Sequence, residues 1–382
     1  MPRRRSDENP FRYGGIARGT YFTDRTVELT RLRDDMRSGQ NVVVISPRRY
    51  GKTSLVQRAI DELRAEDVLV AYVDLFGSPT RELLADHLAQ ALYEGLVDPV
   101  ERALDKVLGF FAHLPIAPRL TVTEDARPAL EFTSFERHED VQKALEGLLA
   151  MPGRIAADRG RRVVLVIDEF QEVVSIDPHL PALMRAIFQA QDEVSHVFLG
   201  SKRHLMQKLF MDRGRHLYRA AKPLPLGPIG PADFAPFLRE RFQAGGIPVD
   251  DAAIDHVLAL TGGRPYETQE LCSFAWSRAR GEGAPVSVEL VGRTLGDLIG
   301  AESARYTAVW DALSAHQRAL LVALARETGE IYSERYRRSH KLGSPGSVRS
   351  SLRRLIEREL VDRNAGYAIS DVFLGEWVRR LD

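Results

Sequence analysis

Two short stretches of this sequence carry side chains suited to phosphate chemistry, and the first is residues 46–54, SPRRYGKTS. A glycine-containing turn that opens a helix directs backbone N–H groups at phosphate oxygens. Gly51 permits close approach of the backbone, and Lys52 can reach the β- and γ-phosphates of a nucleotide. Thr53 offers its hydroxyl to Mg²⁺. We therefore expect a phosphate-binding loop here.

One position of this loop departs from the usual signature, G-x-x-x-x-G-K-S/T. Ser46 stands where that signature has its first glycine. A serine there requires a backbone conformation that a small side chain adopts without a positive φ. Because a lone Gly-Lys-Thr at the start of a helix also occurs by accident, the assignment needs a second motif.

That second motif is the stretch RRVVLVIDEFQE, residues 161–172. An apolar run that predicts a buried strand ends at Asp168 and Glu169. We expect Asp168 to hold Mg²⁺ and Glu169 to orient and polarise an attacking water. A solvated acidic turn is the alternative reading, and the presence of both motifs in this order argues against it.

Two later polar residues fit the same site. Ser201 follows a strand-like segment, where its hydroxyl could sense a γ-phosphate. Arg219 precedes a short strand-like segment, from which it could reach a phosphate in its own chain or in a neighbour's. A helix-capping serine and an ordinary surface arginine are the alternatives.

Positioning these residues requires a parallel sheet, because the carboxyl ends of parallel strands meet at one edge. Strand-like segments alternate with helical patterns, which predicts an α/β fold with a parallel sheet flanked by helices. The strand-like segments lie near residues 41–46, 68–75, 162–168, 195–200 and 222–226.

The segment between the second and third of these strands is unusually long. Residues 80–96 and 138–160 are helical in pattern, and residues 118–132 alternate in a way that predicts a β-hairpin. We expect this insertion, residues 77–160, to form either a partner surface or a lid.

The rest of the chain is mostly helical. Residues 231–300 predict a set of helices, and residues 301–382 predict three helices and a β-ribbon with its turn at residues 364–366, which is a winged helix. Residues 335–358 hold eight Lys or Arg and one Glu. This basic patch indicates contact with duplex DNA, although a protein-binding winged helix or a solvated face would look the same. The residues expected to contact DNA are Arg349, Arg353 and Arg354.

Composition restricts the class of protein. The chain has 382 residues, which predicts two or three domains, and its 53 basic side chains balance 53 acidic ones. Cys272 is the single cysteine, which excludes an internal disulfide and fits a reducing cytoplasm. Apolar runs fall far short of the about 20 residues of a membrane span. Residues 1–10 are basic without a hydrophobic stretch behind them, so we expect a solvated tail and not a signal peptide.

Taken as a set, these motifs resemble the archaeal-type ATPase family, in the STAND and AAA+ branch of P-loop NTPases. The resemblance extends over almost the whole chain, from residues 21–32, through the loop and the acidic pair, to a Gly-Gly-x-Pro turn at 262–265 and a Trp-containing helix near the C-terminus. Ser46 departs from a family glycine, and Val372 departs from a family proline. The resemblance implies an AAA+-like core over residues 1–230, a helical lid over 231–300 and a winged-helix domain over 301–382.

The resemblance also implies roles for individual residues. Phe22, Arg25 and Pro265 would lie near the adenine or ribose, and Ser201 and Arg219 would sense phosphate. Glu169 and Lys52 would act in hydrolysis of ATP, with Asp168 among the ligands of Mg²⁺. The loop residues expected to bind ATP are Ser46, Pro47, Arg48, Arg49, Tyr50, Gly51, Lys52, Thr53 and Ser54.

Three functions compete on these residues. The first is an ATPase whose cycle switches the lid and the winged helix, associated with DNA, a protein partner or a second copy of itself. The second is a nucleotide-gated DNA- or protein-binding switch with negligible turnover. The third is a structural adaptor that no longer binds nucleotide, which the intact Lys52, Thr53, Asp168 and Glu169 argue against.

Overall fold

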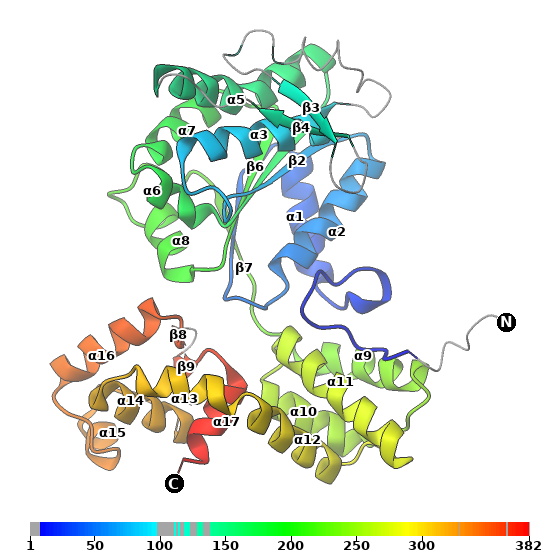
Figure 1. Ribbon diagram of the computed structural model, residues 1–382, viewed down its shortest axis with the longest axis vertical. Helices are drawn as coiled ribbons and strands as arrows, with labels where there is room; N and C mark the ends of the chain where they lie inside the picture. The colour runs from blue at the N-terminus through cyan, green and yellow to red at the C-terminus, as the bar shows by residue number, and fades with distance from the viewer. Residues whose placement is uncertain are drawn as a thin grey trace. The chain divides into compact units, whose positions relative to one another are not determined.

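The computed structural model describes residues 8–97, 111, 114, 118–122, 128–132, 138–327, 329–363 and 366–381. The chain forms two compact units, which Figure 1 shows in ribbon form. The sheet unit is Arg25–Gly227, and the helical unit is Met1–Asp24 together with Pro228–Asp382. The chain therefore passes between the units twice. The predicted boundary at residue 300 lies inside the helical unit and stays a prediction.

The sheet unit contains a five-stranded sheet with the order β2-β5-β6-β1-β7. All neighbouring strands in it run parallel, and each of the five predicted strand segments forms one of its strands. The predicted α/β fold with a parallel sheet is therefore confirmed. The strands are β1 (Val42–Ile45), β2 (Leu69–Asp74), β5 (Val163–Asp168), β6 (Val194–Gly200) and β7 (Lys222–Pro225).

Helices cover both faces of this sheet, so its central strands β1, β5 and β6 are buried at every position, whereas the edge strand β7 is mostly exposed. In β1, Val43 and Ile45 join the main core cluster, whereas Val42 and Val44 are buried against the opposite face. Figure 1 shows α1 and α2 on one side of the sheet and α3, α5 and α7 on the other. These helices are α1 (Thr26–Arg37), α2 (Lys52–Ala65), α3 (Arg81–Leu96), α5 (His138–Arg159) and α7 (Leu180–Phe188).

The strand register brings the expected site residues to one edge. Ile45 of β1 pairs with Gly200 of β6, and Asp74 of β2 pairs with Asp168 of β5. Each of these strands ends there, so the loop after β1, the acidic pair after β5 and Ser201 after β6 leave the sheet at the same edge. The site is thus a consequence of parallel topology.

Short elements complete the sheet unit. A 3-10 turn, η4 (Phe170–Glu172), leads from β5 into α6 (Val173–Ile176), and α8 (Arg203–Phe210) follows β6. The hairpin predicted in the insertion is confirmed, because β3 (Pro118–Val122) and β4 (Pro128–Phe132) pair antiparallel.

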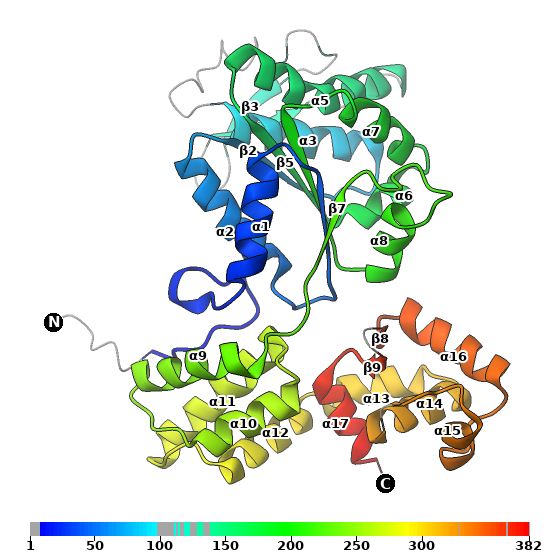
Figure 2. The ribbon, with the colours of Figure 1, turned by 180° about the vertical axis from the view of Figure 1, so that it is seen from behind.

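The helical unit is built around one continuous apolar cluster. Figure 2 shows its helices from behind, as α9–α12 and α13–α17. The helices predicted in residues 231–300 are present. The elements are α9 (Pro231–Ala244), α10 (Asp251–Thr261), α11 (Pro265–Glu282), α12 (Val288–Ala301), α13 (Ser303–Asp311), α14 (Ala315–Arg326), α15 (Glu334–Ser339), α16 (Pro345–Glu357), β8 (Val361–Arg363), β9 (Tyr367–Ile369) and α17 (Val372–Arg379).

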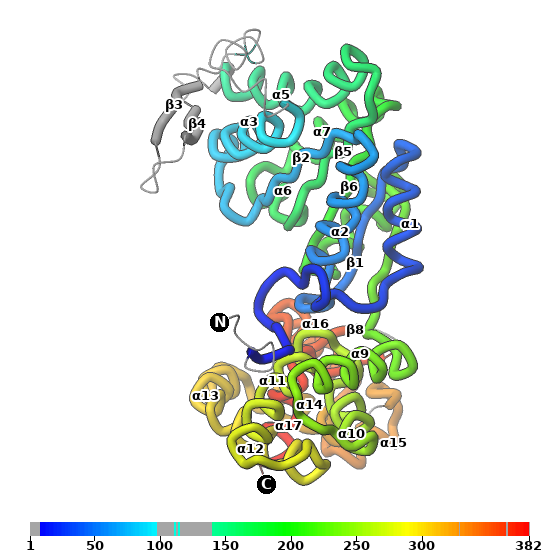
Figure 3. The backbone as a smooth tube through the Cα atoms, turned by 90° about the vertical axis from the view of Figure 1, so that its right-hand side faces the viewer, coloured from blue at the N-terminus to red at the C-terminus, as the bar shows by residue number. Residues whose placement is uncertain are grey.

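The N-terminal segment packs against these helices, in dark blue beside α11 in Figure 3. Asn9 Nδ2 donates to Ser273 O at 3.0 Å, and Phe11 packs edge-on against Phe242. The prediction of a solvated tail was therefore wrong for Asn9 and Pro10, because apolar Phe11 draws the residues before it onto the helices. Residues 1–7 lie outside the described residues.

The predicted winged helix is present in α14–α16 and the β8–β9 ribbon. Val348, Leu352 and Leu355 bury the predicted apolar face of α16. Residues 364 and 365 of the predicted ribbon turn lie outside the described residues. In the part of the chain that the structure describes, every helix is too short or too polar to cross a membrane.

Candidate nucleotide site

The loop between β1 and α2 has the backbone that a phosphate cradle requires. Gly51 precedes the helix with a φ of 82°, a left-handed conformation that favours glycine. Arg49 also has a positive φ, 68°, which costs a non-glycine residue about 1 kcal/mol or more. Strain of this kind persists where function requires the conformation.

Ser46 meets the condition that the sequence set for it. Its φ is outside the positive range, so a side chain is tolerated there without strain. Ser46 is fully buried, and its Oγ donates to Pro47 O at 3.1 Å. The Ser46 hydroxyl proton is thus already used in a hydrogen bond within the loop. The other loop residues divide by exposure, since Tyr50 and Ser54 are buried whereas Arg48 and Arg49 are exposed.

Lys52 is the first residue of α2, and its side chain folds back over the loop. Its Nζ donates to Pro47 O at 3.3 Å, and the side chain is buried. The ammonium group therefore lies over the loop's own backbone, at the N-terminus of a helix, where both the charge and the helix dipole favour an anion.

Asp168 is brought to the start of α2 from the end of β5. Its Oδ2 accepts from Tyr72 OH at 2.5 Å and lies 3.5 Å from Thr53 Oγ1. Its Oδ1 accepts from the backbone N–H of Glu169 at 2.8 Å. Burial, followed by the charges of Glu169 and Asp74, raises the pKa of Asp168 against its hydrogen bonds. A cation at this carboxylate would relieve that unfavourable charge.

These residues fit Mg²⁺. The paired oxygens of Thr53 and Asp168 are hard ligands of the kind Mg²⁺ prefers. Among the described residues, no three His, Cys, Asp or Glu side chains converge as a purely protein-bound metal would need. A Mg²⁺ ion here would complete its shell with water and substrate phosphate, as is usual for this ion.

Glu169 stands at the turn out of β5 with a φ of 48°. Its Oε2 accepts from Ser201 Oγ at 2.7 Å and from the amide nitrogen of Gln171. Burial alone would raise the pKa of Glu169, but these hydrogen bonds and the charge of Lys52 outweigh it, so the pKa lies below its ordinary value. The group is therefore ionised at neutral pH and able to act on a water.

Ser201 links the acidic pair to the loop. Besides donating to Glu169, its Oγ accepts from Arg48 Nε at 3.4 Å. The hydroxyl thus lies between the expected water-activating group and the loop. Gln171 and Tyr72 belong to the same network, and the sequence assigned neither of them. Each lies in a stretch whose sequence predicts a strand or its end, and neither has a neighbouring pattern that would indicate a functional side chain.

The structure places two predicted arginines in the sheet unit but away from this network. Arg219 is exposed, and its guanidinium lies 5.3 Å from the centre of the Tyr218 ring. Arg25 is buried, and its guanidinium bonds Glu28 Oε1 at 2.9 Å and Gly227 O at 2.5 Å. Arg25 thereby ties together the two places where the chain leaves the sheet unit.

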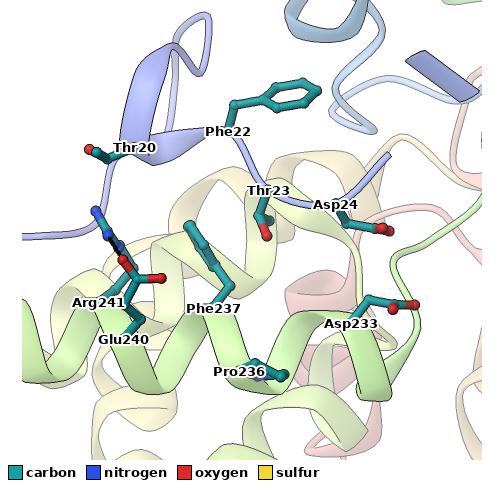
Figure 4. A pocket seen from close by; sticks show the side chains of 9 residues that line it. All are labelled: Thr20, Phe22, Thr23, Asp24, Asp233, Pro236, Phe237, Glu240 and Arg241. Carbon is teal, nitrogen blue, oxygen red and sulfur yellow. Dashed lines mark hydrogen bonds and ion pairs between the residues drawn. The ribbon is translucent and has the colours of Figure 1, made fainter. Parts of the chain in front are cut away.

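Phe22 and Pro265 belong to the helical unit. Phe22 is among the residues that line a cavity of about 380 Å³ formed by the N-terminal segment and α9, and Figure 4 shows its ring pointing away from the other lining side chains. Phe237 and the Arg241–Glu240 ion pair line its other side. Pro265 begins α11 after Gly263, where an added Cβ would meet Ile229 O at 2.1 Å. The predicted Gly-Gly-x-Pro turn therefore needs glycine for close packing.

Arg264 in this turn reaches the winged helix. Its NH2 donates to Ile369 O at 3.0 Å, and its NH1 donates to Ser370 O. On α16, the predicted DNA contacts Arg349, Arg353 and Arg354 are all exposed. Arg353 Nε also lies 3.9 Å from Glu357 Oε1 on the same helix.

Comparisons with known proteins agree with this site. A family model described as an ATPase domain predominantly from Archaea matches residues 22–271, and one described as a probable winged helix domain matches residues 304–380. A WD repeat-containing protein of Synechocystis sp. is 24% identical over an alignment of 283 residues, which covers 69% of this chain and 21% of that protein. The chain thus spans about a fifth of that relative's length.

Two solved structures share the fold across nearly their whole length. A Walker-type ATPase of Pyrococcus abyssi is 16% identical with a TM-score of 0.64, covering 97% of this chain and 99% of that one. The ORC2 protein of Aeropyrum pernix, solved as ADPNP–ADP complexes, is 16% identical with a TM-score of 0.54, covering 98% and 96%. Since the first family model matches most of the chain, and the loop, the acidic pair and the parallel sheet all agree with it, the chain belongs to the family of ATPase domains found predominantly in Archaea.

Proposed function

We propose that this chain binds ATP with Mg²⁺ at the carboxyl edge of its sheet and hydrolyses it, with Glu169 orienting and polarising the attacking water. The observation that carries this proposal is the Glu169 carboxylate, which is ionised, directly follows Asp168, and is linked to the loop through Ser201 and Arg48. A general base must be held within hydrogen-bonding reach of its water, and these contacts supply that restraint.

The loop and Lys52 bind the phosphates in this proposal. Lys52 Nζ now donates to Pro47 O, a neutral acceptor. An anionic phosphate oxygen is a stronger acceptor, because charge-assisted hydrogen bonds are roughly twice as strong as neutral ones. ATP therefore draws the ammonium from the loop carbonyl to the phosphates. Thr53 and Asp168 hold Mg²⁺, which neutralises charge on the phosphate oxygens when bound.

Three further assignments belong to this proposal. Phe22 and Pro265 contact the base or ribose, and Arg25 supports that contact from the sheet unit by fixing the start of α1. Arg219 is exposed and therefore available to the phosphates of a neighbouring copy, which makes a homo-oligomer the expected active form. The single cysteine supports a cytoplasmic setting.

We propose that the nucleotide state switches the helical unit. The chain crosses between the units at Asp24–Arg25 and at Gly227–Pro228, and the Arg25 bond to Gly227 O joins both crossings. Within the helical unit, Arg264 joins the turn before α11 to the winged helix. A change in the bound nucleotide could thus act on the helical unit through the two chain crossings. The internal contacts of the helical unit would then let it respond as a whole.

The winged helix is proposed to contact duplex DNA through α16. Arg349, Arg353 and Arg354 are exposed on this helix, and in the neighbouring ribbon Arg363 lies over the Tyr367 ring. Basic side chains on a helix beside a β-ribbon support contact with phosphates and a groove. A protein partner for the same surface is the outcome to expect if DNA has no effect.

One observation favours a second function, a nucleotide-gated switch with negligible turnover. Ser201 and Gln171 both donate to Oε2 of Glu169, so that oxygen of the carboxylate is occupied before any water arrives. Purified protein carrying tightly bound ADP would support this function. Rapid basal turnover would exclude it.

The DNA proposal is tested by phosphate release with and without duplex DNA at two salt concentrations. The test variant replaces Arg349, Arg353 and Arg354 by alanine, and a matched control replaces three exposed arginines elsewhere. We expect DNA to raise turnover in the wild type and the control but not in the test variant, with an effect that falls as salt rises. Equal turnover with and without DNA in the wild type would remove DNA as the partner. The control positions are Arg154, Arg239 and Arg293.

A further inference from the structure

Two side chains donate to the same oxygen of the Glu169 carboxylate. Ser201 Oγ donates to Oε2 at 2.7 Å, and the amide nitrogen of Gln171 donates to the same Oε2. The backbone N–H of Ser201 and the charge of Lys52 also act on this carboxylate. Ser201 and Gln171 together therefore restrain one oxygen of Glu169.

Gln171 is itself held firmly enough to restrain another side chain. It lies in the turn η4, and it is 3% exposed. The preceding Phe170 is fully buried and packs edge-on against Phe198 at 4.6 Å, which fixes the turn on the core. The amide nitrogen also lies 3.4 Å from Glu172 Oε1, and Glu172 is paired with Lys202 at 2.8 Å.

Only one orientation of the Gln171 amide satisfies these neighbours. Its nitrogen faces two carboxylates, which accept hydrogen bonds and never donate them when ionised. Rotating the amide by 180° would set its oxygen against those carboxylates. In the present orientation the amide oxygen is buried without a hydrogen-bond partner. The chain thus tolerates an unsatisfied buried oxygen in order to direct the nitrogen at Glu169, and such exceptions call for a functional reason.

Gly200 makes this arrangement possible. It is the last residue of β6, immediately before Ser201. A Cβ added at Gly200 would lie 2.5 Å from the amide oxygen of Gln171 and 2.5 Å from Met206 Sδ. The Gly200-Ser201 pair therefore has two functions at this corner, since the first residue leaves room for Gln171 and the second donates beside it.

We infer that Gln171 is a positioning residue for ATP hydrolysis, which together with Ser201 restrains Oε2 of Glu169 and so fixes the orientation in which the carboxylate meets the attacking water. This inference rests on the proposed role of Glu169. Gln171 touches neither ATP nor the water in this arrangement. Gln171 instead fixes the orientation of the Glu169 carboxylate, which contacts the water. Loss of Gln171 should therefore affect the chemical step and not the binding of nucleotide.

The test compares Gln171→Met, which keeps the length of the side chain but removes its donors, with Gln171→Asn, whose amide is one methylene too short to reach Glu169. For each variant, kcat for phosphate release and the Kd of a fluorescent ATP analogue are measured. We expect kcat to fall by about tenfold or more while Kd changes by less than about twofold, as for loss of a group that orients another. In a Glu169→Gln background, Gln171→Met should lower turnover no further.

The matched control is Gln191→Met. Gln191 is also a buried glutamine of the sheet unit, and its Nε2 donates to Leu149 O at 2.9 Å, outside the site network. This variant should lower the melting temperature with kcat unchanged. A second route to the same effect is Gly200→Ala, which displaces the Gln171 amide and should reproduce its loss of kcat.

The outcomes separate this inference from the proposed function. If Glu169→Gln keeps full turnover, the role of Glu169 fails, and the inference fails with it. If Glu169→Gln abolishes turnover but Gln171→Met and Gln171→Asn both keep wild-type kcat, the inference alone is overturned. A rise in Kd that accounts for the whole loss would also overturn it, since that result would place Gln171 in nucleotide binding.

Discussion

The Thr53 hydroxyl lies 3.5 Å from Asp168 Oδ2, although 115 positions separate the two residues in the chain. Parallel strands β1 and β5 both end at this edge, with β6 between them, and this shared edge brings the start of α2 to the end of β5. Two oxygens at this spacing suit a hard divalent cation. The pair is therefore the clearest physical basis for Mg²⁺-dependent nucleotide binding.

Removing this pair should remove the dependence of ATP binding on Mg²⁺. In the wild type, replacing Mg²⁺ by EDTA should weaken the Kd of a fluorescent ATP analogue by about tenfold or more, because the ion then no longer bridges protein and phosphate. In Asp168→Asn and Thr53→Val, EDTA should change that Kd little. Exposed Asp67→Asn is the control and should behave as the wild type. A full Mg²⁺ effect in Asp168→Asn would place the ion elsewhere.

Tyr72→Phe should weaken the same dependence without unfolding the protein. Tyr72 OH donates to Asp168 Oδ2 at 2.5 Å, so it orients a carboxylate that is proposed to hold the ion. Partners of metal-binding groups typically contribute about 10-fold to 100-fold in affinity. We expect a weaker apparent affinity for Mg²⁺ in ATP turnover, with unfolding by urea changed by about 1 kcal/mol. An unchanged Mg²⁺ titration would show that Thr53 suffices to orient Asp168.

Ser46→Gly should keep the affinity for ATP. The Ser46 hydroxyl is buried and bonded to Pro47 O, so it does not face a phosphate, and the backbone there needs no glycine. The variant should lose roughly 0.5–1 kcal/mol of stability, because glycine gains entropy in the unfolded chain. Calorimetric titration with ATP measures the affinity. A loss beyond about tenfold, roughly 1.4 kcal/mol, would mean that the hydroxyl contributes to binding directly.

The stability of the sheet unit should fall in acid through His196. This side chain is fully buried beside Phe188, with Asn41 and Gln191 at its two ring nitrogens, and burial lowers its pKa to about 3. The unfolded chain binds the proton near pH 6.5, whereas the folded chain does not until about pH 3. The folded state therefore loses stability as the pH falls between these values, by at most about 1.4 kcal/mol for each pH unit.

Urea unfolding of wild type and His196→Gln at several pH values between 4 and 7.5 measures this effect. The stability of the variant should depend less steeply on pH in this window. Exposed His316→Gln should retain the wild-type slope. Parallel slopes for the wild type and His196→Gln would show that other groups cause the loss of stability in acid.

Most of the sheet could be predicted because its central strands are buried on both faces, so that β1 and β5 read as apolar runs that end at polar residues. β5 is the clearest case, since Val163–Ile167 end at Asp168 and Glu169, and both side chains lie where the motif requires. The β3–β4 hairpin was also predictable, because apolar and polar residues alternate along much of this segment.

The network around Glu169 could not be read from the sequence. Gln171 acts on Glu169 only because a 3-10 turn brings its amide back toward the strand end and Gly200 leaves room for it, and neither condition has a sequence pattern. Tyr72 lies among apolar residues of β2, so its sequence context predicts only a strand residue and gives no sign of a role for its hydroxyl. The composition around Asn9 and Pro10 predicts a solvated segment, yet contacts with helices distant in the sequence hold these residues in place. Local sequence patterns do not reveal such long-range contacts.

If Glu169 activates the water, the site should bind ATP independently of that carboxylate but should not hydrolyse it. Phosphate release and ATP-analogue binding by wild type and Glu169→Gln, with and without duplex DNA, separate these two properties. We expect the variant to bind ATP with affinity within a few fold of the wild type while its turnover falls by about 100-fold or more. Turnover near the wild-type rate in a folded, ATP-bound Glu169→Gln protein would contradict it.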